Sequence, residues 1–174
     1  MNKEWSELNK TMQAQIKKKD TYRMGIDTLF SLRSQLMQTL VSFKEELCRE
    51  AFNSIPFINA DGYHSKTIAY SIWHIFRIED IVVHTVINED EQVFFAGNYQ
   101  ERINSPIITT GNELIKQQIA DFSKQLNLEE LYSYIFEVRE STEKMLERLS
   151  YDELKRKIPE ERKGYLESLN VVND

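Results

Sequence analysis

One segment of the chain concentrates the residues that could do chemistry. All three histidines, His64, His74 and His84, lie within or just before the stretch 65–88. In this stretch His74 and Glu79 stand among apolar residues. Because burying an ionisable group is costly unless a partner satisfies it, these two positions indicate either a polar network or a functional site.

The spacing of the histidines excludes the simplest metal site. His74 and His84 are ten residues apart, which on one helix is roughly 15 Å along the axis with a rotation of about 80°. The ligands of one zinc ion must each lie about 2 Å from it. The sequence also contains no H-x-x-x-H and no H-E-x-x-H. A metal held by His74 would therefore need carboxylates, waters or a second chain as further ligands, and otherwise His74 is a hydrogen-bonded core histidine.

Glu79 is open to three interpretations: a metal ligand, a general base, or half of a buried ion pair with Arg33 or Arg139. From the residues alone, both a structural ion pair and a role in a functional site remain open for Glu79. The sequence contains no G-x-S-x-G, no glycine-rich phosphate loop and no C-x-x-C. No sequence motif therefore specifies a reaction.

Helical periodicity runs through most of the 174 residues, and only five glycines and three prolines interrupt it. Apolar residues three and four apart predict helices over 3–19, 26–51, 65–88, 113–126 and 128–149, with a loop over 52–63 and a long connection over 89–112. On the helix 65–88, capped by Ser65, we expect Arg77, Asp80 and His84 on the solvent side. There Arg77 and Asp80 would form a surface pair worth little energetically. The sequence thus predicts an all-α fold, with one helical-bundle domain over 1–158 and a polar, loosely held tail over 159–174.

Composition narrows the class of protein. A net charge of −6 argues against general nucleic-acid binding, which requires a basic surface. The single cysteine, Cys48, excludes an intrachain disulfide, fits a reducing compartment, and is interpreted as structural. The N-terminus lacks the apolar core of a signal peptide, and no apolar run approaches the ~20 residues that span a bilayer. We therefore expect a cytoplasmic protein without membrane or nucleic-acid partners.

The segment Ser71-Ile72-Trp73-His74-Ile75-Phe76-Arg77-Ile78-Glu79-Asp80 resembles the second bundle helix of DinB-like proteins, the family that includes the YfiT-type metal-dependent hydrolases. That helix carries the pattern W-H-x-x-R-x-E-D, with its histidine facing the bundle centre. The resemblance extends from the N-terminal helix to about Leu149. It implies an up-down-down-up four-helix bundle, often dimeric, with nickel or zinc bound by three histidines. Some relatives are thiol-dependent transferases or isomerases that use small thiols such as bacillithiol or mycothiol.

Residue by residue, the resemblance transfers one ligand, His74. The family's other two histidines form an H-x-x-x-H on the last bundle helix, and this sequence has no such motif. The last helix is therefore expected to be short or missing, as in a shortened version of a longer protein or a divergent member with an incomplete site. Either case predicts an apolar groove that a partner subunit or a rearranged tail would cover.

Two functions follow as expectations. In the first, the protein is a divalent-metal-dependent hydrolase or thiol transferase whose substrate is a small thiol or another small molecule. His74 is then a nickel or zinc ligand, and Glu79 moves protons. In the second, it is a non-catalytic bundle that acts through self-association, and His74 and Glu79 form a structural polar network. A homodimer is expected in both.

Overall fold

In a computed structural model, which describes residues 3–55, 57–59 and 65–171, all regular secondary structure is helical, and this confirms the all-α prediction. The α-helices are α1 Lys3–Ile16, α2 Tyr22–Glu46, α3 Arg49–Asn53, α4 Ile68–Ile81, α5 Val93–Ala96, α6 Tyr99–Ile103, α7 Gln117–Gln125, α8 Leu128–Arg148 and α9 Glu160–Ser168. The described residues also form 3-10 turns at Lys19–Thr21 and Glu153–Lys155 and a π-helix, Val82–Asn88. Among the described helices none is long and apolar enough to cross a bilayer.

The chain divides into two compact units. The first comprises Met1–Leu47 and Leu146–Arg156, and the second comprises Cys48–Met145 and Lys157–Asp174. The division into one domain over 1–158 and a tail over 159–174 stays a prediction from the sequence. His74 and Glu79 both belong to the second unit.

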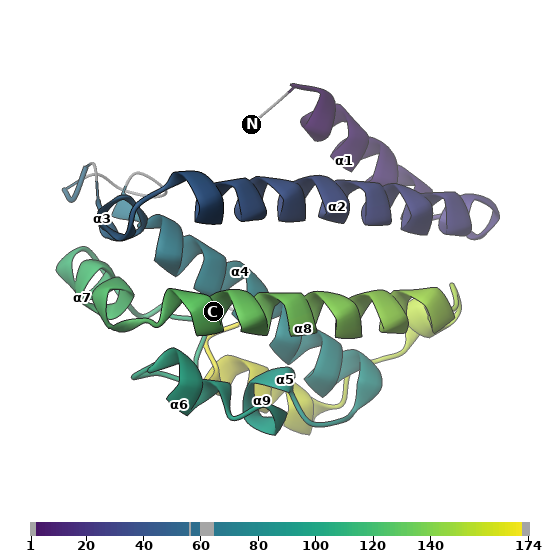
Figure 1. The fold of residues 1–174 in the computed structure, drawn as a ribbon. Helices are drawn as coiled ribbons and strands as arrows, with labels where there is room; N and C mark the ends of the chain where they lie inside the picture. Colours follow the sequence, from purple (N-terminus) through teal and green to yellow (C-terminus); the bar gives the residue numbers. More distant parts are fainter. Residues whose placement is uncertain (1–2, 56, 60–64, 172–174) are drawn as a thin grey trace. The chain divides into compact units, whose positions relative to one another are not determined.

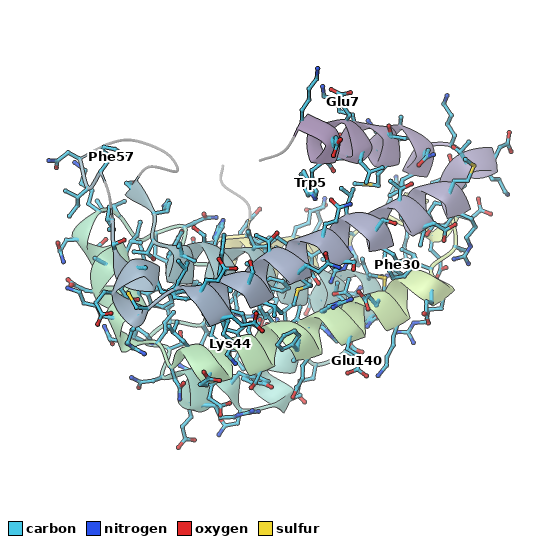
Figure 2. The ribbon with its side chains drawn as sticks, turned by 45° about the horizontal axis from the view of Figure 1, so that its top comes forward. Trp5, Glu7, Phe30, Lys44, Phe57 and Glu140 are labelled. Carbon is cyan, nitrogen blue, oxygen red and sulfur yellow. The ribbon has the colours of Figure 1, made fainter. Side chains whose placement is uncertain are left out.

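In the first unit α1 folds back along α2 (Figure 1). Half-buried Trp5 lies on the side of α1 that faces α2, and Glu7 lies on the opposite side (Figure 2). The two helices approach closely at Gly25, where an added Cβ would lie 2.7 Å from Cγ1 of Ile16. The narrow apolar stripe of the first helix therefore packs against a larger helix, as its spacing indicates.

In the second unit α4 crosses α8, and α5, α6 and α9 gather below them (Figure 1). Trp73 of α4 is fully buried and packs edge-on against Phe94 and Phe122, with ring centres 5.5 Å apart in both pairs. Tyr134 of α8 packs edge-on against Phe94 and contacts Tyr99 at a tilt, with ring centres 5.8 and 5.2 Å apart. This aromatic core fixes α4, which carries the candidate site residues.

Several helix boundaries differ from the sequence expectation. The expected helix 26–51 is observed as α2 followed by the separate α3, and the expected helix 113–126 begins only at Gln117. Helix α4 begins after Thr67, whose Oγ1 accepts from the N–H of Tyr70, rather than after Ser65. The expected helix 65–88 changes to a π-helix in its last seven residues. The connection 89–112 contains the short helices α5 and α6.

The segment expected as a loosely held tail contains α9. Its Leu166, together with Leu169, is buried in a cluster with Ile81 of α4. Although the helix is polar overall, these two side chains are enough to anchor it, because a few fully buried leucines contribute several kcal/mol (about 1.5–3 each).

Candidate functional site

His74 is half-buried on α4, and its ring orientation is fixed on two sides. Its Nδ1 donates to the carbonyl oxygen of Thr110 at 2.9 Å. Its ring stacks on Tyr70, with ring centres 5.5 Å apart and planes 10° apart. Because a carbonyl can only accept, Nδ1 carries the proton, and Nε2 of the neutral ring carries the lone pair.

The carbonyl that binds His74 is itself held in place. The N–H of Thr110 donates to the carbonyl of Leu169 at 3.1 Å, and its Oγ1 donates to the carbonyl of Asn170 at 2.6 Å. The next residue, Gly111, has a φ of 80°, and an added Cβ there would lie 3.0 Å from the Tyr70 ring. Glycine is therefore required at this turn, and the Tyr70 hydroxyl donates to its carbonyl at 2.9 Å. Burial raises the pKa of Tyr70 to about 12, and the nearby Glu113 adds to the rise.

Glu79 is half-buried and accepts a hydrogen bond of 2.6 Å from Oγ1 of Thr142 on α8. It follows His74 by five residues, so the two side chains leave α4 about 140° apart. They consequently contact different elements, and the structure does not bring them together. Of the two arginines expected as partners, Arg139 pairs with Glu143 at 2.8 Å, and the ion pair of Glu79 with Arg33 stays a prediction.

The expectation that Arg77, Asp80 and His84 lie on the solvent side is wrong. Arg77 and Asp80 have no exposed surface, and His84 is 6% exposed. The guanidinium of Arg77 contacts the Asp80 carboxylate at 3.3 Å and also donates to the carbonyl of Ile108 and to the side chain of Gln92. The physical reason is that the connection 89–112 covers this face of α4 and supplies hydrogen-bond partners, which a single-helix projection cannot include.

Asp80 is the centre of this buried network. Besides Arg77, its carboxylate accepts from the N–H groups of Val93 and Phe94, at 2.9 and 3.0 Å, and from the Tyr134 hydroxyl at 2.9 Å. The two N–H groups open α5, so Asp80 caps that helix from a distant position. Burial raises the pKa of Asp80, while Arg77 and these donors act against the rise. Burial and the Asp80 charge together raise the pKa of Tyr134 well above its ordinary value.

A second cluster, which sequence reasoning missed, surrounds His84 on the π-helix. Its Nδ1 lies 2.5 Å from Oδ1 of Asp90, and its Nε2 lies 2.9 Å from Oγ of Ser141 on α8. Oδ1 of Asp80 lies 3.8 Å from the same Nε2. No sequence motif predicts that His84, Asp90 and Ser141 meet, because Ser141 follows His84 by 57 residues.

A cavity of about 880 Å³ opens beside His84. The residues that line it include His84, Asp90, Gln92, Phe95, Arg162 and Tyr165. All of them belong to the second unit. This cavity thus lies at the π-helix, whose His84 follows His74 by ten residues.

The fit of a metal at His74 depends on further donors. Within the described ranges, no group of three or more His, Cys, Asp or Glu residues is placed to hold a metal ion. His64 lies outside those ranges, and Cys48 is an exposed residue at the start of α3. The described residues therefore include His74, the ligand that the resemblance predicts, without a group of three such residues around it.

Comparison with known proteins matched no protein-family model and no curated protein. The resemblance to DinB-like proteins therefore rests on the sequence of residues 71–80 alone and stays a prediction. The structure explains three residues of that pattern in physical terms: Trp73 fills the core, and Arg77 and Asp80 form the buried network.

Proposed function

We propose that this protein is a DinB-like helical protein that binds a divalent cation, nickel or zinc, through Nε2 of His74, and that it is a hydrolase or a small-thiol transferase. The observation that carries this function is the hydrogen bond from Nδ1 of His74 to the Thr110 carbonyl. Histidines that bind metals typically donate their other ring N–H to a carbonyl or carboxylate, which fixes the tautomer and directs the lone pair. The ring is also only half-buried, so Nε2 need not be a core atom.

The chain's own residues position this ligand. Tyr70 holds the ring plane, Thr110 holds the proton on Nδ1, and Leu169 and Asn170 hold Thr110. Because the described donors do not complete a site, this function requires ligands from outside the described ranges or from a partner chain. A bound divalent ion would supply Lewis acidity toward a water or thiol. Glu79 faces α8, so a proton-transfer role for it requires a path other than direct contact with His74.

Elemental analysis of the purified protein tests this function directly. We expect near-stoichiometric nickel or zinc that is lost in His74→Ala. The matched control is His84→Asn, which removes the other described histidine and should keep its metal. Absence of metal from every sample, even after incubation with excess nickel or zinc, would contradict metal binding.

A second candidate function is a non-catalytic bundle that acts through self-association. It is favoured by the hydrogen bonds that His74 and Glu79 make inside the unit, to Thr110 and Thr142. Large apolar side chains on α4 and α8, Ile75 at 46% and Phe136 at 41%, are exposed to solvent. Light scattering tests for the homodimer that both functions include, and Phe136→Glu should weaken it. The single cysteine fits the cytoplasmic location proposed with either function.

A further inference from the structure

Helix α9 ends in a Schellman cap that has asparagine in the place usually taken by glycine. The N–H of Val171 donates to the carbonyl of Leu166 at 3.1 Å, and the N–H of Asn170 donates to the carbonyl of Glu167 at 3.0 Å. Asn170 has a φ of 56°, the left-handed conformation that this cap requires and that asparagine adopts more readily than most residues. Val171 also packs against the cluster that contains Leu166. The backbone that follows α9 therefore has a defined direction.

The carbonyls at this helix end bind a turn from a distant part of the chain. The carbonyl of Leu169 accepts from the N–H of Thr110 at 3.1 Å. The carbonyl of Asn170 accepts from Oγ1 of Thr110 at 2.6 Å and from Nδ2 of Asn112 at 2.7 Å. Thr110 has no exposed surface. Loss of the two carbonyls would therefore leave buried donors without partners, which is costly.

Thr110 links this helix end to the candidate site. Its own carbonyl accepts from Nδ1 of His74 at 2.9 Å. The next carbonyl, that of Gly111, accepts from the hydroxyl of Tyr70, whose ring stacks on His74. A hydrogen bond to a ring N–H is lost within a small displacement, since its usual range is only about 2.7–3.2 Å. The position of Thr110 consequently decides whether His74 keeps its acceptor.

Helix α9 is the part of this chain of contacts that can open locally. It has nine residues, of which Leu166 is buried, and Leu169 directly follows it. An isolated helix of this length is marginal in water. The ion pair of Arg162 with Glu89 is partly exposed, and such pairs contribute little. Because segments held by few buried apolar contacts open at a lower cost than the whole fold, α9 can be released while α4 stays folded.

We propose that the segment 166–171 positions His74 through Thr110 and thereby regulates the candidate site. With the segment docked, the Thr110 carbonyl holds the proton on Nδ1 and leaves the lone pair on Nε2. With the segment released, the neutral ring exchanges between its two tautomers, so Nε2 carries the proton for part of the time. The consequence for metal binding rests on the proposed function, whereas the effect on the ring does not. Leu169 and Asn170 are positioning residues in this scheme.

Substitutions at Asn170 can release the segment without changing either residue of the His74 hydrogen bond. Asn170→Gly tolerates the positive φ and removes only the side-chain bond to Glu113, so it should leave the segment docked. Asn170→Val should break the cap, because a β-branched residue disfavours the left-handed conformation. Leu169→Ala is a second releasing variant, which acts through the buried cluster instead of the cap.

The full chain is treated with a chelator and measured at about pH 8, where an ordinary histidine is neutral. NMR of ¹⁵N-labelled histidine reports which ring nitrogen is protonated, and the signal absent from His74→Ala identifies the ring. We expect His74 protonated on Nδ1 in the unmodified chain and in Asn170→Gly. In Asn170→Val and Leu169→Ala the two nitrogens should give averaged signals, and the Thr110 amide should exchange hydrogen about tenfold faster or more.

The matched control is Asn104→Val, which introduces the same backbone strain at the end of α6, where φ is 60°. It should leave the His74 signals as they are in the unmodified chain. A ring that keeps its Nδ1 proton in both Asn170→Val and Leu169→Ala overturns the positioning role. A change that Asn104→Val produces equally also overturns it, since general loss of stability would then be the cause.

Nickel titration of the same samples tests the proposed function separately. Nickel affinity should be about tenfold lower or less in Asn170→Val than in Asn170→Gly, as is typical when the group that orients a metal-binding histidine is disturbed. Rings that respond as expected in a chain that binds no nickel contradict the metal site and support the positioning role. Equal nickel affinity in all variants, with an unchanged His74 ring, contradicts the positioning role and leaves the metal site standing.

Discussion

The guanidinium of Arg77 lies 3.3 Å from the carboxylate of Asp80, and neither side chain is exposed to solvent. The two residues are one helical turn apart on α4, but each also binds the connection that follows the π-helix. Arg77 binds the carbonyl of Ile108, and Asp80 binds the N–H groups of Val93 and Phe94. Arg77 and Asp80 therefore hold the connection 89–112 against α4.

Asp80→Ala should lower the free energy of unfolding by about 3–5 kcal/mol, because it leaves the Arg77 charge buried without its partner. Urea denaturation followed by circular dichroism measures the change. Asp121→Ala on α7 is the control, since Asp121 is exposed and its loss should change stability by about 0.5 kcal/mol or less. A loss below about 1 kcal/mol for Asp80→Ala would show that the buried pair is not a structural requirement.

His74→Ala should lower the free energy of unfolding of the metal-free protein by ~1–3 kcal/mol. The Thr110 carbonyl loses its donor, and the Tyr70 ring loses its stacking partner. Thermal or urea denaturation after treatment with a chelator gives the value. Unchanged stability would mean that water replaces the imidazole at no cost.

Alkaline pH should destabilise the fold between pH 10 and about 12. Burial raises the pKa of Tyr70 and of Tyr132 to about 12, and burial with Glu137 nearby does the same for Tyr99, from an ordinary value of 10.0. Within this window the unfolded chain has released protons that the folded chain retains, so stability is complete below pH 10 and falls as the pH rises. Tyrosinate absorbance should show a late component that coincides with loss of helicity, and Tyr70→Phe should reduce it. Titration of every tyrosine in one step near pH 10, with helicity intact, would contradict this.

Leu169→Ala should release α9 before the rest of the second unit unfolds. Leu169 is 3% exposed and packs with Leu166 and Ile81, so its truncation should cost about 2–5 kcal/mol. Hydrogen exchange of the α9 amides should accelerate strongly. Leu154→Ala, at a residue 44% exposed, is the control and should leave α9 protected. If α9 exchanges no faster in Leu169→Ala, the cluster is not what anchors it.

Periodicity predicted the long helices well, because one apolar stripe per helix reflects burial along that helix. Helix 128–149 is observed as Leu128–Arg148, and 3–19 as Lys3–Ile16. The positions of polar side chains were less predictable. Arg77 and Asp80 look exposed on a single helix, and only their partners in the distant connection make burial favourable.

The cluster at His84 could not be predicted for a different reason. It depends on a local departure from α-helical geometry and on Glu89, whose backbone is left-handed. Glycine or asparagine usually occupies such a position, so a glutamate there gives no sign of the turn. Ser141 joins it only through tertiary packing. His74 was identified because its residue type contrasts with its apolar neighbours, but its partner, the Thr110 carbonyl, is a backbone group that any residue supplies.

The π-helix Val82–Asn88 has a consequence for insertions and deletions in this chain. Because its hydrogen bonds span five residues instead of four, it holds one more residue than an α-helical stretch of the same span. Deleting a single residue there would let α4 continue as a regular α-helix. Every side chain after the deletion would then turn by about 100°. Such a deletion would leave a continuous helix. It would nevertheless separate the His84 ring from both Asp90 and Ser141.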